Sequence, residues 1–169
     1  MAKPILIGMN NPVSTRAGHE LYPLPDGCTG NRIWKMLSAR TGATMRQYLE
    51  TFERRNLVRG AAFDKVQARA KAYEYVVELR DSGRTVVLLG NEVRRAFDFV
   101  LRGDGSLFGD EGLPPVLVHP TVIGGVTWRQ IPHPSGLNRW YNEPENVKVV
   151  ELLLEELYLD ASRGDASAA

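Results

Sequence analysis

Short apolar runs alternate with amphipathic stretches along most of the chain. Two runs are continuous, residues 4–8 (PILIG) and residues 85–90 (TVVLLG). Runs of this length and composition are typical of strands that are buried on both faces of a parallel sheet. Residues 126–132 alternate apolar and polar positions, which is also typical of a strand, and residues 55–58 are a shorter candidate. We therefore predict four strands at these positions.

The segments between these strands carry apolar residues at helical spacing. Helices are predicted from residue 31, at 45–54, at 61–81 and at 92–101, and a last helix follows residue 142. The helix at 61–81 is expected to be the longest. Its apolar stripe, which we expect to pack in the core, consists of Phe63, Val66, Ala70, Tyr73 and Val77.

Strands that alternate with helices predict an α/β protein. The specific expectation is a three-layer α/β/α sandwich with a central, mostly parallel four-stranded sheet. Residues 116–119 are expected to add a hairpin arm before the strand at 126–132, around Gly124 and Gly125. Residues 1–160 are expected to form one domain, and the small, polar residues 161–169 a flexible C-terminal tail.

Composition narrows the class of protein. At 169 residues and 43% hydrophobic content, the chain can bury a sizeable core without covalent staples. A single cysteine, Cys28, excludes an intramolecular disulfide and favours a reducing compartment, so we expect a cytoplasmic protein. We find no metal-ligand spacing and no apolar run of membrane-spanning length. We therefore expect no metal, no cofactor and no membrane partner, and we expect a monomer.

Polar and turn residues follow the predicted strands. Asn10 and Asn11 follow the first strand, Asn56 lies in the short second strand, and His133 follows the strand at 126–132, so all four are expected at strand ends. The carboxyl ends of parallel strands meet at one edge of a sheet, where ligands of open α/β sheets bind. After His133 comes a Pro-Ser-Gly turn and then Leu137, an apolar residue with no evident place in the core. We expect a functional site at this edge.

Four motifs in this order resemble the uracil-DNA glycosylase superfamily. Residues 8–12 (GMNNP) resemble the Gly-x-Asn-Pro loop of its mismatch-specific and single-strand-selective branches. Residues 30–35 (GNRIWK) are similar to the Asn-Arg-x-Trp-Lys helix start of the mismatch-specific branch, and residues 55–57 (RNL) form the third motif. Residues 133–139 (HPSGLNR) combine the histidine of one branch with the Pro-Ser-Gly-Leu of another. The resemblance spans residues 5–140.

The resemblance implies a DNA glycosylase of DNA repair, which hydrolyses the N-glycosidic bond of uracil or a modified pyrimidine flipped out of DNA. His133 would donate a hydrogen bond to the departing base, as an oxyanion-hole donor does. The family has one residue between its Gly-x and its Pro, whereas this chain has two asparagines. If the motif is aligned on Gly8, Asn10 takes the catalytic position. If it is aligned on Pro12, Asn11 takes that position. We favour Asn11, because the proline fixes the φ angle of the loop.

The same resemblance assigns residues that bind the base and the DNA. An asparagine in place of a carboxylate predicts a slow enzyme, because an amide can position water but is a poor base. The residues expected to bind the base are Gly8, Met9, Tyr22 and Asn56. The residues expected to bind DNA phosphates are Ser14, Ser135, Gly136 and Arg139. Leu137 would be the wedge that fills the space left by the extruded base.

Two alternatives stay open at this point. The doubled asparagine and the loop at residues 22–29 are compatible with a protein of the same fold that acts on a hypermodified base or a nucleotide. The other alternative is a non-catalytic nucleic-acid binding module that keeps the base-binding pocket of the family. The net charge is +1, so any contact with DNA must come from local patches of charge.

Overall fold

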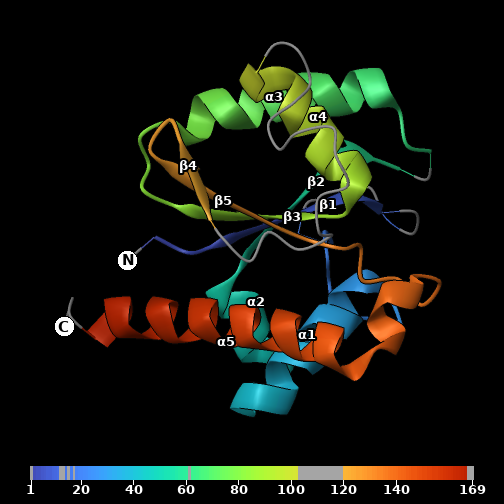
Figure 1. The fold of residues 1–169 in the computed structure, drawn as a ribbon, viewed down its shortest axis with the longest axis vertical. Helices are drawn as coiled ribbons and strands as arrows, with labels where there is room; N and C mark the ends of the chain where they lie inside the picture. Colours follow the sequence, from blue (N-terminus) through green and yellow to red (C-terminus); the bar gives the residue numbers. More distant parts are fainter. Residues whose placement is uncertain are drawn as a thin grey trace.

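The computed structural model describes residues 2–11, 14, 16, 18–60, 62–102 and 120–166. Within these residues the centre of the molecule is a five-stranded sheet in the order β2-β1-β3-β5-β4 (Figure 1). Strands β1, β2, β3 and β5 are parallel, and β4 pairs with β5 in the antiparallel direction at one edge. Their bounds are Ile5–Asn11 for β1, Glu53–Arg59 for β2, Thr85–Leu89 for β3, Thr121–Ile123 for β4 and Val126–Ile131 for β5.

The mostly parallel α/β sandwich predicted from the sequence is confirmed. The four parallel strands are the four expected ones, and β4 is an addition at the edge. It forms the hairpin arm around Gly124 and Gly125, whereas the arm expected at residues 116–119 lies outside the described residues. β1 is also longer than predicted, since Asn10 and Asn11 still pair with β2.

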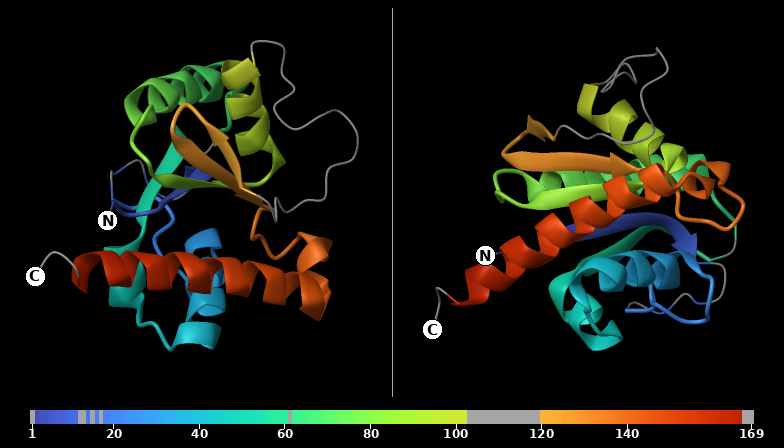
Figure 2. Two further views of the ribbon diagram at one scale, coloured as in Figure 1. Left: turned by 60° about the vertical axis from the view of Figure 1, so that its left-hand side comes forward. Right: turned by 60° about the horizontal axis from the view of Figure 1, so that its bottom comes forward.

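Two helical layers cover the sheet (Figures 1 and 2). One layer consists of α3 (Lys65–Leu79) and α4 (Asn91–Arg102), and the other of α1 (Thr29–Thr41), α2 (Met45–Thr51) and α5 (Pro144–Ala166). Because successive strand residues point to opposite faces, Ile7 packs under the first layer and Leu6 under the second. A short 3₁₀ helix, η1 (Arg139–Asn142), precedes α5.

Helix α3 corrects one prediction, because the apolar stripe expected in the core faces solvent. Val66, Tyr73 and Val77 are 76%, 62% and 58% exposed, and only Phe63 packs against the core. The buried side of the helix instead carries Ala68, Ala72, Tyr75 and Leu79. Both stripes alternate steps of three and four residues, so periodicity does not choose between them. The small side chains of the alanine stripe allow the helix to lie closer to the sheet.

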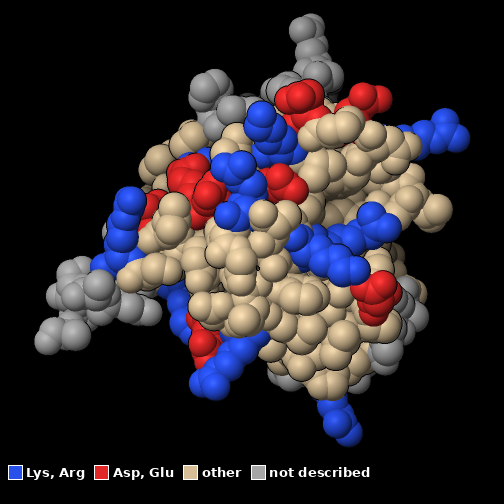
Figure 3. All heavy atoms as spheres, turned by 90° about the horizontal axis from the view of Figure 1, so that it is seen from below, with Lys and Arg blue, Asp and Glu red and all other residues tan. Residues whose placement is uncertain are grey.

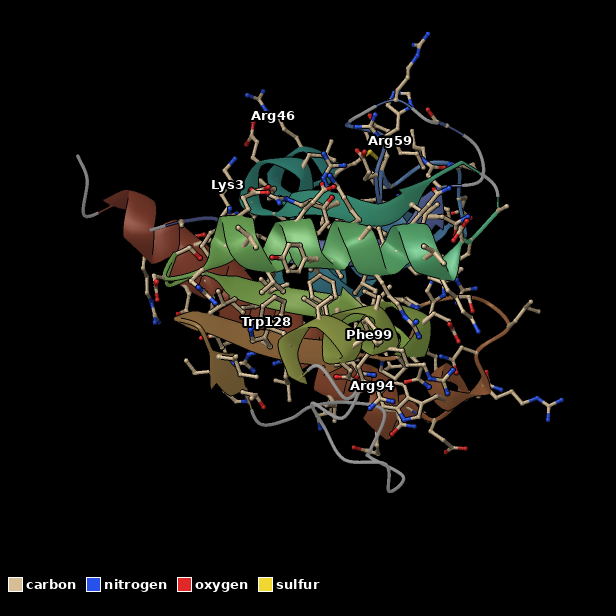
Figure 4. All side chains as sticks on the ribbon, turned by 90° about the horizontal axis from the view of Figure 1, so that it is seen from above. Lys3, Arg46, Arg59, Arg94, Phe99 and Trp128 are labelled. Atoms are coloured by element: carbon tan, nitrogen blue, oxygen red, sulfur yellow. The ribbon has the colours of Figure 1, made fainter. Side chains whose placement is uncertain are left out.

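Figure 4 shows this layer from above, with α3 crossing the sheet beside α4. The rings of Phe97 in α4 and Trp128 in β5 lie 5.2 Å apart between the layer and the sheet, where both side chains are buried. Phe99 lies on the outer side of α4, and the guanidinium of Arg69 covers its ring at 4.2 Å.

Three further element boundaries differ from the prediction. α2 ends at Thr51, so Glu53 and Arg54, expected in that helix, belong to β2. α5 continues to Ala166, so residues 161–166, expected in a flexible tail, are helical, whereas residues 167–169 lie outside the described residues. α5 is therefore the longest described helix, in place of the helix predicted at 61–81. No helix in the described ranges is both long and apolar enough to cross a membrane.

The strand order puts the point where the chain connections diverge at the carboxyl ends of β1 and β3. After β1 the chain turns through α1 and α2 on one face to reach β2, and after β3 it turns through α4 on the opposite face to reach β5. Neighbouring strands whose connections diverge in this way leave an open crevice, which is where doubly wound sheets bind their ligands. Of the polar residues predicted at strand ends, Asn10, Asn11 and His133 lie at this edge.

Candidate active site

A cavity of about 310 Å³ opens beside the carboxyl end of β1. This volume is at the lower end of the range for small-ligand pockets, roughly 300–1,000 Å³. Residues of three segments meet there: the end of β1, the loop before α1, and the loop after β5. The lining residues are Asn10, Asn11, Ser14, His19, Leu21, Tyr22, Leu24, Pro25, Gly27, Cys28, Thr29, Gly30, Ser135 and Gly136.

Both candidate asparagines reach this cavity, and each is held by a backbone carbonyl. Asn10 donates its Nδ2 to the carbonyl of Gly60 after β2, at 3.0 Å. Asn11 donates its Nδ2 to the carbonyl of His19, at 2.9 Å, and its Oδ1 accepts from the backbone N–H of Ser14, at 3.2 Å. Asn11 therefore ties the end of β1 to the loop that follows it. Pro12, the residue that favours Asn11 in the alignment, lies outside the described residues.

A buried asparagine holds the loop that forms the outer wall. Asn31, in the first turn of α1, is 2% exposed and donates its Nδ2 to the carbonyl of Pro23, at 3.0 Å. Its Oδ1 accepts from the N–H of Gly27, at 3.0 Å. Cys28 caps α1: its Sγ accepts from the N–H of Asn31 and donates to the carbonyl of Tyr22. The wall is thus fixed to the helix by side-chain bonds, which explains why an asparagine stands at this position of the second motif.

Tyr22 lies in this wall. Its side chain is 37% exposed, and its ring lies 6.1 Å from the ring of His19, tilted by 38°. An aromatic face at the rim of a cavity can stack on a planar ligand.

His133 directly follows β5, beside the end of β3. A Cβ built on Gly90, whose φ is +95°, would lie 2.8 Å from the Cβ of His133, so glycine at the end of β3 allows the histidine to approach. Burial lowers the pKa of the imidazole below its ordinary value of 6.5, so the ring is neutral at pH 7. A neutral imidazole can donate one hydrogen bond to a developing anion.

The loop that starts at His133 is braced by Asn138. The Nδ2 of Asn138 donates to the carbonyl of His133, at 3.0 Å, and its Oδ1 accepts from the N–H of Trp140, at 3.2 Å. Backbone bonds from Ser135 to His133 and from Asn138 to Ser135 close the turn. Leu137, at the tip, is 94% exposed, the highest exposure of any large apolar side chain described.

The residues predicted to contact DNA lie around this tip. Ser135 and Gly136 line the cavity, as does Ser14 from the opposite side, and Arg139 is exposed just beyond the turn. The guanidinium of Arg32 lies against Gly136 and donates to the carbonyl of Gly27, at 3.2 Å, so it joins the two loops that border the cavity. This role of Arg32 was not predicted from the sequence.

Three predicted base-binding residues lie deeper than the cavity wall. Gly8 is buried in β1, directly opposite Asn56 in β2, so Asn56 is in the middle of its strand and not at the end. Asn56 is 8% exposed, and its Oδ1 makes no hydrogen bond within the described part of the chain. Met9 packs against the core on the α3 side, so its side chain points away from the cavity. Neither these residues nor the His133 ring lines the cavity.

Several residues that build this site were missed at the sequence level. Leu21 forms part of the cavity wall, Gly90 seats His133, and Asn138 braces the loop. Gly90 had a detectable signal, because a glycine that ends a buried strand marks a position with unusual backbone geometry. Leu21 had none, since a leucine in a polar loop shows no periodic pattern.

Near the site, basic side chains lie among acidic ones and pair with them locally. Figure 3 views the face formed by α1, α2 and α5, where acidic side chains lie among the basic ones. Lys35 pairs with Asp26, and Arg40 pairs with Glu155 on this side. Among the described residues no group of three or more His, Cys, Asp or Glu side chains is placed to hold a metal ion.

No protein-family model matches the chain, and no curated protein sequence matches it.

Proposed function

We propose that the protein is a DNA glycosylase that hydrolyses the N-glycosidic bond of uracil or a modified pyrimidine flipped out of DNA. Leu137 carries the proposal: it is 94% exposed on a braced loop whose preceding residues, Ser135 and Gly136, line a cavity. Exposing a leucine in this way has no benefit for folding. An apolar side chain next to a small-molecule cavity can fill the gap in a duplex while the displaced base occupies the cavity.

The chemistry fits the polar groups at this edge of the sheet. Cleavage of an N-glycosidic bond leaves negative charge on the departing pyrimidine, and a neutral His133, whose ring lies outside the cavity lining, would donate a hydrogen bond to the O2 of a base that extends beyond the cavity wall. Asn10 and Asn11 line the cavity and can position the attacking water. Neither amide is an efficient base, so the reaction is expected to be slow. The enzyme would belong to DNA repair, acting before the abasic site is processed.

A second candidate is an activity of the same site on a hypermodified base or a free nucleotide. It is supported by the two asparagines and by the wall at residues 22–29, which together line the cavity. A non-catalytic nucleic-acid binding module is the third. The three differ in their products: an abasic site with released base, an altered base or nucleotide, or binding alone.

The test incubates the protein with oligonucleotides that carry uracil, hypoxanthine or modified pyrimidines and measures alkali-labile breaks and released base. We expect breaks at uracil or a modified pyrimidine. We expect His133→Ala to slow base release by about two orders of magnitude or more, the scale of removing one oxyanion donor. Tyr73→Ala, which truncates an exposed ring on α3, is purified in the same way and should keep wild-type rates.

His133→Ala also controls for contaminating glycosylase, because a contaminant ignores this substitution. Equal rates for wild type and His133→Ala would remove the histidine from the mechanism. Absence of breaks in all substrates, with an altered base recovered, would support the second candidate.

A further inference from the structure

Leu21 occupies the space beside the amide of Asn56. A Cβ built on Gly8 would lie 3.0 Å from Cδ2 of Leu21 and 2.5 Å from Oδ1 of Asn56. The leucine side chain and the amide oxygen therefore both lie over the same glycine. Leu21 itself is 8% exposed and forms part of the cavity wall.

The backbone holds Leu21 in this place. The buried hydroxyl of Tyr48 donates to the carbonyl of Leu21, at 3.0 Å, and Arg54 donates to the carbonyl of Glu20, at 3.1 Å. The peptide between Leu21 and Tyr22 packs so closely on Gly30 that a side chain there would collide with it. Leu21 has a φ of +48°, a conformation that leucine rarely adopts. The fold thus keeps a strained leucine over Gly8.

This arrangement leaves the amide oxygen of Asn56 without a partner in the described structure. Buried polar atoms are nearly always hydrogen-bonded, and exceptions are common at functional sites. An unpaired amide oxygen needs a donor, and the N3–H of uracil is a donor of the right kind. Leu21 belongs both to the cavity wall and to the surroundings of Gly8, so it lies on the path from the cavity to this oxygen.

We propose that Leu21 controls access to Asn56: the side chain closes the base-recognition space in the unliganded protein, and a pyrimidine contacts the amide only after displacing it. This inference rests on the proposed function and adds to it the residue that limits which ligands are bound. Displacement reduces the apparent affinity of a base that enters the space over Gly8, because only the fraction of molecules with Leu21 turned aside can bind it there. A base with an N3–H donor enters that space and satisfies the oxygen of Asn56, whereas a base without a donor binds outside it and does not depend on Leu21.

The test measures binding of free uracil and of 3-methyluracil, which lacks the N3–H, by titration calorimetry or NMR. The variant is Leu21→Ala, which keeps a Cβ and therefore the same backbone strain while opening the space over Gly8. Leu153→Ala is the matched control, because Leu153 is 7% exposed in the same apolar cluster and its truncation costs similar packing. Leu21→Gly, suited to a positive φ, is the second variant in case Leu21→Ala folds poorly.

We expect Leu21→Ala to bind uracil about tenfold more tightly than wild type, the effect of raising a binding-competent population from roughly one-tenth to nearly all. The gain should be absent for 3-methyluracil, for Leu153→Ala and for the double variant Leu21→Ala/Asn56→Ala. Unchanged uracil affinity in both Leu21 variants, or an equal gain for 3-methyluracil, would overturn the proposal.

The binding assay needs no catalysis, so the two proposals can fail separately. If no base is released from DNA but Leu21→Ala gains uracil affinity through Asn56, the role of Leu21 stands and the glycosylase function fails. If wild type releases uracil from DNA and the Leu21 variants gain no affinity, the function stands and the role of Leu21 fails.

Discussion

At the scale of single residues, the buried imidazole of His133 links stability to pH. Burial lowers the pKa of His133 in the folded protein below the ordinary 6.5. As the pH falls below 6.5, the unfolded chain takes up a proton that the folded chain resists, so the free energy of unfolding decreases. We expect wild type to lose stability relative to His133→Gln between about pH 7.5 and about pH 5.5. Urea denaturation at each pH measures this difference, and a constant difference would show that burial does not disfavour the charged ring.

The two asparagines can be ranked by substitution. We expect Asn11→Ala to lower base release more than Asn10→Ala, because Asn11 both lines the cavity and ties Ser14 and His19 to the end of β1. Single-turnover rates on one uracil substrate give the ranking, with thermal melts to confirm that both variants fold. The reverse order would identify Asn10 as the residue that positions water, with Gly8 setting the register of the motif.

At the scale of elements, the loop that carries Leu137 should matter only where a base has to be displaced. We expect Leu137→Ala to slow release from duplex DNA by about tenfold or more and to change release from single strands much less, because only a duplex has a stacked partner to displace. Leu24→Ala, at another exposed apolar position, would be a poor comparison, since Leu24 lines the cavity. Val66→Ala on α3 is the better control. Equal losses on both substrates would mean that Leu137 contributes packing and not displacement.

Helix α3 shows why elements are easier to predict than their faces. The existence of the helix follows from its apolar periodicity. The four parallel strands follow from continuous or alternating apolar runs. The stripe at Val66, Ala70, Tyr73 and Val77 and the stripe at Ala68, Ala72, Tyr75 and Leu79 have the same spacing, and only the distance between helix and sheet decides which is buried. That distance depends on tertiary packing, which a single sequence does not encode locally.

At the scale of the whole molecule, a net charge of +1 leaves little long-range attraction for DNA. On the proposed function, DNA binding would therefore depend on a few local cations, and Arg139, exposed next to the Leu137 tip, is the candidate to test. We expect Arg139→Ala to weaken binding on all sequences alike and to reduce the slope of log affinity against log salt by about one. Binding isotherms at several salt concentrations measure that slope. A slope unchanged by the substitution would place Arg139 away from the phosphates.

The site was predictable in part. The strand-end positions of Asn10, Asn11 and His133 follow from the topology of parallel sheets, and the exposure of Leu137 follows from its place after a Pro-Ser-Gly turn. Leu21 and Asn138 were not predictable, because their roles come from hydrogen bonds and contacts between loops that carry no periodic signal. Asn56 was placed in the correct strand, but its lack of a hydrogen-bond partner is visible only in three dimensions.

The brace that Asn138 forms across residues 133–139 has a consequence for conformational entropy. Ordering a flexible segment costs roughly 1–2 kcal/mol per residue, and in this loop that ordering is complete when the chain folds. On the proposed function, the protein then loses little backbone freedom when it meets DNA, and most of the remaining work is the unstacking of the target nucleotide. A stiff loop of this kind favours nucleotides that are already weakly stacked or mispaired, since these cost the least to extrude.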